Sequence, residues 1–166
     1  VQWERLWPAA SRTTAPGEML AGAVLAVDGD HLGAIGSFNR ALVADPTISA
    51  AQFGRGVAFT ARQRYDRAIE AFTLATTIDP SDGVAQTFRS FALLRSDIFA
   101  EALTAADAAL ARDRRYDEAR IARGLALIGL GRKVEGADEL KLGLSLMRDA
   151  ARAQAIITNN LEPNAP

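Results

Sequence analysis

Few residues in this chain have the type and spacing that catalysis needs. His31 is the single histidine, and it follows the short acidic stretch Asp28–Gly29–Asp30. A hydrolytic triad requires a histidine held between a nucleophile and an acid, and the sequence shows no such arrangement around His31. We therefore expect His31 to pack between two helices, and we predict that the protein is not an enzyme.

Metal and cofactor sites are equally poorly supported by the sequence. The chain has no cysteine, which excludes thiolate metal sites, thiol catalysis and disulfides. Asp28–Gly29–Asp30 is too short for a calcium loop, whose ligands are spread over about a dozen residues. No glycine-rich phosphate loop follows a strand, because no strands are predicted. Glu135 and Glu139 stand at i and i+4, which is typical of a solvated helix face. We expect no cofactor and no metal.

Three arginines, Arg55, Arg89 and Arg123, recur at intervals of 34 residues. One interpretation is a ladder of guanidinium groups that binds phosphate or carboxylate. The other is structural: each aliphatic stem packs within a helix pair, and the guanidinium pairs with an acidic neighbour such as Glu70. Because the spacing is so regular, the elements that position these arginines must repeat as well.

The 34-residue period extends through most of the chain, in four blocks at residues 15–48, 49–82, 83–116 and 117–150. Small residues occupy three positions of every block: Gly22, Gly56, Ser90 and Gly124 at position 8, Ala34, Ala68, Ala102 and Gly136 at position 20, and Ala41, Ala75, Ala109 and Gly143 at position 27. Position 24 holds Phe38, Phe72, Ala106 and Leu140. Small residues let two helices approach closely, and large residues at position 24 fill the remaining gap.

Each block has the pattern of two amphipathic helices. In the second block we expect helices over about 50–62 and 65–78, joined by a turn at Gln63–Arg64. The step Asp79–Pro80 ends the second helix, because proline disfavours helical geometry at the residue before it. Ser81 or Asp82 can then cap the next helix.

This helix–turn–helix unit resembles the tetratricopeptide repeat over residues 15 to about 150. The resemblance implies an all-α fold, a right-handed α-α superhelix of four repeats closed by a C-terminal capping helix. It also implies a concave face lined by the first helix of each pair, where ligands of the family usually lie. Arginine before glycine at positions 7 and 8 is common in the family, which favours the structural interpretation of the three arginines.

Ligands in this family usually contact positions 2, 5, 9 and 12 of each block. We expect the partner-binding groove to comprise Met19, Ala23, Phe53, Val57, Thr60, Val84, Thr87, Phe91, Leu94, Ile121, Leu125 and Ile128. Among the residues at these positions only Glu118 is charged, and so continuous an apolar surface exceeds what soluble monomers usually expose. Phe53 and Phe91 are the expected exposed anchors, since aromatic side chains dominate binding hot spots. The alternative is that some of these side chains pack between neighbouring first helices.

The residues at these positions also indicate the chemistry of the partner. Co-chaperone members of the family hold a C-terminal carboxylate with lysine, arginine and asparagine, and those donors are absent from the matching positions here. A carboxylate would lose its water without gaining a cation. We therefore expect a protein or peptide partner that presents a hydrophobic or amphipathic segment. A self-assembling scaffold remains the alternative, with its groove filled by the N-terminal segment or by another subunit.

Both ends of the chain depart from the repeat pattern. Residues 1–14 are expected to form an extension with a short helix and a linker, since Trp3, Leu6 and Trp7 recur at helical spacing. This segment either caps the first block or docks into an apolar groove. We expect residues 151–160 to form a capping helix over the last repeat, followed by a flexible tail at 161–166.

Composition bounds the environment of the protein. A formal net charge of -1 provides no general attraction to nucleic acid or anionic membrane. No apolar run reaches the length of a membrane span, and no signal peptide is visible, although the chain begins at Val1. We expect a soluble protein, for which the cytoplasm and a periplasmic or exported location both stay open.

Overall fold

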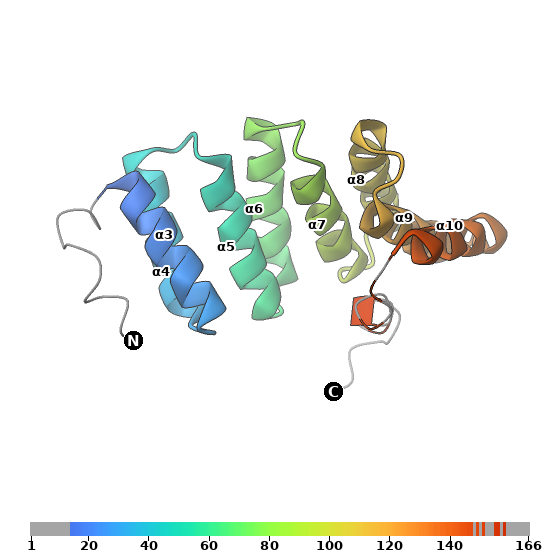
Figure 1. The fold of residues 1–166 in the computed structure, drawn as a ribbon, viewed down its shortest axis with the longest axis horizontal. Coiled ribbons are helices and arrows are strands. Elements are labelled where there is room, and N and C mark those ends of the chain that lie inside the picture. Colours follow the sequence, from blue (N-terminus) through green and yellow to red (C-terminus); the bar gives the residue numbers. More distant parts are fainter. Residues whose placement is uncertain (1–13, 148, 150, 152–154, 157, 159–166) are drawn as a thin grey trace. The chain divides into compact units, whose positions relative to one another are not determined.

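The structure, a computed structural model, describes residues 14–147 together with 149, 151, 155, 156 and 158. In this part of the chain the regular secondary structure is helical and there is no strand, which confirms the predicted all-α class (Figure 1). The helices are α3 (Ala15–Val27), α4 (His31–Ala44), α5 (Ser49–Ala61), α6 (Tyr65–Ile78), α7 (Gly83–Leu94), α8 (Phe99–Arg112), α9 (Asp117–Gly129) and α10 (Lys133–Leu146). None of the described helices is long and apolar enough to cross a membrane.

The helix starts follow the period of the sequence. The first helices begin at Ala15, Ser49, Gly83 and Asp117, and the second helices begin at His31, Tyr65, Phe99 and Lys133. Each series advances by 34 residues. We interpret the four helix pairs as four repeats. In the second pair the helices span 49–61 and 65–78, within one residue of the ranges expected from the pattern.

The chain forms two compact units, one ending at Pro80 and the other beginning at Ser81. In the N-terminal unit α4 packs against α3 and α5, and α5 packs against α6. In the C-terminal unit α8 packs against α7 and α9, and α9 packs against α10 and α7 (Figure 1). The predicted extension, with Trp3, Leu6 and Trp7, lies outside the described residues. So does most of the predicted capping helix and all of the tail.

Short turns and side-chain caps set the ends of the helices. Thr14 Oγ1 accepts a hydrogen bond from the Gly17 amide at 3.2 Å, and Asp82 Oδ1 accepts one from the Ala85 amide at 2.9 Å. Asp82 is thus one of the two caps that the sequence allowed for α7. The turn before α4 contains Gly29 at a φ of 82°, a conformation that glycine adopts without steric cost.

Glycine and phenylalanine interlock inside the helix pairs. A Cβ atom built on Gly22 would lie 2.7 Å from Phe38 Cε1, and one built on Gly56 would lie 2.5 Å from Phe72 Cε1. The position-24 ring therefore occupies the space that the position-8 glycine leaves open, as the pattern predicted. In the third pair, Ser90 Oγ instead donates a buried hydrogen bond to the Ala102 carbonyl at 2.8 Å.

Candidate functional site

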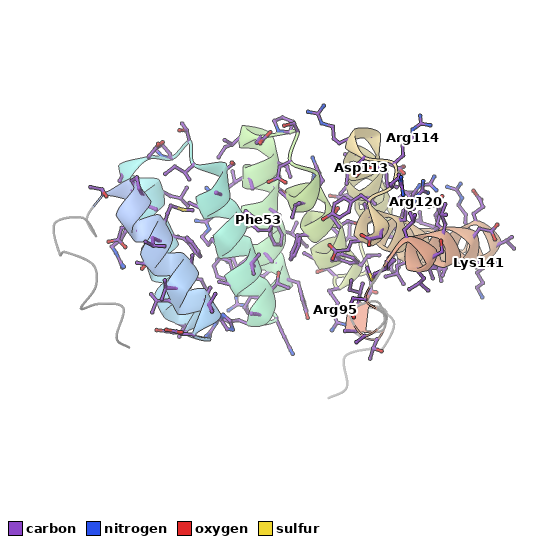
Figure 2. The ribbon with its side chains drawn as sticks, viewed as in Figure 1. Phe53, Arg95, Asp113, Arg114, Arg120 and Lys141 are labelled. Atoms are coloured by element: carbon purple, nitrogen blue, oxygen red, sulfur yellow. The ribbon has the colours of Figure 1, made fainter. Side chains whose placement is uncertain are left out.

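The first helices of the N-terminal unit present a partly exposed apolar surface. Of the residues predicted here, Ala23 is exposed, and Met19, Phe53, Val57 and Thr60 are half-buried. Phe53 projects from α5 (Figure 2) and packs on Phe72, with ring centroids 5.7 Å apart. Phe53 is therefore part of the packing of its own helix pair as well as part of the surface.

In the C-terminal unit the predicted groove residues divide into two groups. Val84 is 45% exposed, and Phe91 and Ile128 are half-buried. The other four, Thr87, Leu94, Ile121 and Leu125, are buried. α7 packs directly against α9, and Ile121 also lies against α10, where a Cβ atom built on Gly143 would come within 2.9 Å of Ile121 Cγ1. Their burial supports the interpretation that they pack between helices.

Two of the three recurring arginines, Arg55 and Arg123, bond to neighbouring helices. The third, Arg89, has a buried Nε atom with no hydrogen-bond partner among the described residues. Arg123 on α9 donates from Nε to Asp107 Oδ1 of α8 at 2.7 Å and from Nη1 to Glu139 Oε1 of α10 at 2.8 Å. These hydrogen bonds and the nearby negative charges raise the pKa of Arg123. Arg55 on α5 donates to Asn39 Oδ1 of α4 at 3.2 Å, and the negative charge of Glu70, the neighbour that the sequence suggested, also acts on its guanidinium. Burial lowers the pKa of Arg55. These contacts favour the structural interpretation over an anion ladder.

Glu139 is not on a solvated face, contrary to the expectation from its spacing. Its side chain is only 19% exposed and pairs with Arg120 at 2.9 Å as well as with Arg123 (Figure 2 shows Arg120 on α9). Two cations from α9 thus neutralise one carboxylate of α10. Glu135, by contrast, lies at the surface and pairs with Arg132, so the expectation holds there.

No catalytic arrangement appears among the described residues. His31 is half-buried at the start of α4, and its Nδ1 atom is buried without a hydrogen-bond partner in this part of the chain. Nor does any group of three histidine, aspartate or glutamate residues lie close enough to bind a metal ion, within the residues that were placed.

A pocket of about 560 Å³ opens in the C-terminal unit. It is lined by Val84 and Phe88 of α7, Tyr116, Asp117 and Glu118 at the start of α9, and Leu146, Met147 and Asp149 at the end of α10. Two of these residues, Val84 and Glu118, stand at position 2 of their blocks. The sequence pattern did not indicate Phe88 or Tyr116, because the pocket forms only where three separate helix ends meet.

The pocket is acidic and aromatic. Glu118 is 7% exposed, and its Oε2 accepts a hydrogen bond from the Tyr116 hydroxyl at 3.3 Å. Burial, together with the negative charge of Glu118, raises the pKa of Tyr116 to about 12. Asp117 and Asp149 add two more carboxylates to the lining, and among the described residues that form it there is no lysine, arginine or histidine. This chemistry suits a cation or an apolar group, and it disfavours an anion.

Part of the chain is similar to known proteins. A family model described as tetratricopeptide repeat matches residues 20–83. The peroxisomal targeting signal receptor of Candida albicans is 33% identical over 95 residues, which are 57% of this chain and 16% of the relative. The chain therefore spans about a sixth of that receptor's length.

Solved structures with a similar fold extend over most of the chain. A crystal structure of MamA protein matches with a TM-score of 0.77 and 22% identity, covering 92% of this chain and 82% of MamA. The first TPR domain of Spaghetti (RPAP3), bound to the HSP90 peptide SRMEEVD, matches with a TM-score of 0.59 and 26% identity over 68% of this chain and 90% of that domain. The fold is thus that of helical repeat solenoids of this kind.

Proposed function

Because the chain belongs to the tetratricopeptide-repeat family, we propose that it is a non-enzymatic protein-interaction module, an adaptor or assembly factor, which binds a hydrophobic or amphipathic segment of a partner. Two comparisons support protein binding: the RPAP3 domain is bound to an HSP90 peptide, and the Candida protein is a targeting signal receptor. The surface offered to the partner consists of the first-helix residues that remain exposed or half-buried in each unit.

The pocket of the C-terminal unit is the main observation behind this proposal. Its walls include the apolar side chains of Val84, Phe88, Leu146 and Met147. Apolar pockets with a few polar groups are the usual form of a binding site. Val84 is nearly half exposed, so an apolar side chain of a partner would bury surface there that water now contacts.

The acidic lining supports a preference for positive charge in the bound segment. A carboxylate in this pocket would be repelled by Asp117, Glu118 and Asp149, and the described lining residues include no cation that would compensate for its lost water. A lysine or arginine would gain attraction to the carboxylates, and the rings of Phe88 and Tyr116 would add cation–π interaction. The proposed partner segment therefore combines apolar residues with at least one basic residue.

Binding of labelled model peptides tests this proposal. Two amphipathic peptides with the same apolar residues, one with lysines and one with glutamates on the polar face, are compared by fluorescence anisotropy. The lysine peptide is expected to bind more tightly, and Glu118→Gln to reduce this preference because it removes one carboxylate. Val84→Ser is expected to lower the affinity for the lysine peptide roughly fivefold, which corresponds to about 1 kcal/mol of binding free energy.

Val134→Ser is the matched control, since Val134 is an exposed valine on α10 that does not line the pocket. It is expected to bind both peptides as the wild type does. Equal affinity for the two peptides, or tighter binding of the glutamate peptide, would show that the charge preference is wrong. If neither peptide binds, the apolar-segment proposal itself is wrong.

A further inference from the structure

Contacts within the two units show which side of the first helix of a pair packs against the second helix of the pair before it. On α5, a Cβ atom built on Gly54 would lie 2.5 Å from Phe38 Cζ of α4, and the neighbouring Arg55 bonds to Asn39 of α4. On α9, Gly129 lies against the Phe99 ring of α8. Gly54 and Arg55 are at positions 6 and 7 of their block, and Gly129 is at position 13. We call positions 6, 7 and 13 the leading face of a first helix.

The leading face of α3 is apolar and partly uncovered. Its residues are Leu20, Ala21 and Val27; Leu20 is 43% exposed and Val27 is 88% exposed, whereas Ala21 is buried. Elsewhere in the two units these positions include glycines that are pressed against a phenylalanine ring. On α3, two large aliphatic side chains instead meet no covering helix among the described residues. Terminal repeats of a solenoid usually need a cap at such a place.

A second copy of the chain does not match this face well. Suppose that α10 of one copy packed on α3 of another copy in the same way as α4 packs on α5. Lys141 of the first copy would then lie opposite Ala21 of the second. At the corresponding joints within the units, Asn39 pairs with Arg55 and Asp107 pairs with Arg123. The polar pair that characterises both joints would therefore be missing between copies.

The segment that precedes α3 is long enough to reach the face. Thr14 is the N-cap of α3, so along the helix axis Leu20 lies about 9 Å and Val27 about 20 Å from it. The seven residues from Pro8 to Thr14 span up to about 24 Å when extended. Trp3, Leu6 and Trp7, which precede this linker, can therefore reach both aliphatic side chains.

We propose that residues 1–13 fold back along the leading face of α3 and cover Leu20 and Val27 with the apolar side chains of Trp3, Leu6 and Trp7. This intramolecular cap does not involve the pocket of the C-terminal unit. Ala23 lies three residues from Leu20 and four from Val27, on the same stripe of α3. The cap would cover Ala23 as well, so the surface left to a partner would begin at α5.

Tryptophan fluorescence of the full chain tests the cap directly, because Trp3 and Trp7 are the only tryptophans. A synthetic peptide of residues 1–14 supplies the emission wavelength and acrylamide quenching of the free segment. In the wild-type protein, emission is expected at shorter wavelength, with weaker quenching. The double variant Leu20→Ser, Val27→Ser is expected to shift both values to those of the peptide, while circular dichroism shows unchanged helix content.

Val43→Ser is the matched control, since Val43 is also 88% exposed but lies on α4. It is expected to keep the wild-type emission. Peptide-like emission from the wild-type protein would overturn the proposal, and so would blue-shifted emission that persists in the double variant. If the blue shift disappears on dilution together with a fall in mass by light scattering, a second copy is the occupant and the intramolecular cap is wrong.

Discussion

Arg123 of α9 pairs with Asp107 of α8 across an Nε–Oδ1 distance of 2.7 Å. The same guanidinium reaches Glu139 of α10, so one side chain joins its own helix to the helix before it and the helix after it. The Arg55–Asn39 hydrogen bond spans the same number of residues in the N-terminal unit, with an amide in place of the carboxylate. Arg55 and Arg123 thus each link their own helix to the second helix of the preceding pair within their unit.

Removing this arginine should destabilise the C-terminal unit. We expect Arg123→Met to lower the free energy of unfolding by about 1.5–3 kcal/mol, the range for hydrogen bonds to charged groups, because Glu139 is mostly buried. Asp107→Asn is the comparison, and it should cost less than about 1 kcal/mol because the Asp107 side chain is half exposed. Urea denaturation followed by circular dichroism measures both. An equal loss in the two variants would contradict the expectation that the Arg123–Glu139 pair contributes more than the Arg123–Asp107 pair.

Two glycine substitutions should have opposite effects. A Cβ atom on Gly124 would lie 2.8 Å from the Gly136 carbonyl oxygen, whereas one on Gly36 meets only the flexible end of Arg40 at 3.5 Å. Gly124→Ala should therefore destabilise the fold by about 1–3 kcal/mol through overpacking. Gly36→Ala, inside α4, should stabilise it by about 0.5–1 kcal/mol. Thermal or urea unfolding of both variants gives the signs, and stabilisation by Gly124→Ala would contradict the close approach of α9 and α10.

Tyr116 should titrate at a higher pH than a free tyrosine, and its ionisation should make the stability of the fold fall at alkaline pH. Its pKa is raised to about 12, above the unfolded value of about 10, so the folded state holds the phenolic proton more tightly. The resulting contribution to stability is complete below about pH 10 and is lost as the pH rises toward 12. Ultraviolet difference titration of a Tyr65→Phe variant isolates Tyr116, because the chain has two tyrosines.

Glu118→Gln is the control for the cause of this shift. Removing the charge should bring the pKa of Tyr116 part of the way toward 10, while the burial that makes the larger contribution remains. A Tyr116 that titrates near 10 in the wild type would show that the pocket is more open to water than its geometry indicates.

The repeat pattern was enough to predict the helices and their pairing. Gly22 and Gly56, with Phe38 and Phe72, encode a close approach between adjacent helices, and Asp82 marks the start of a helix. These features depend on neighbours within one helix pair. Helical periodicity and turn chemistry therefore reveal them without any knowledge of the remaining chain.

Tertiary structure decided which of the expected groove residues are accessible. Thr87 and Ile121 occupy groove positions in the sequence but are buried, while Val84 stays exposed. Glu139 likewise changes from an apparent surface residue into the acceptor of two arginines. The physical reason is that burial depends on how closely α7, α9 and α10 approach one another. Periodicity shows which side of a helix faces inward, but it does not specify how far a neighbouring helix covers that side.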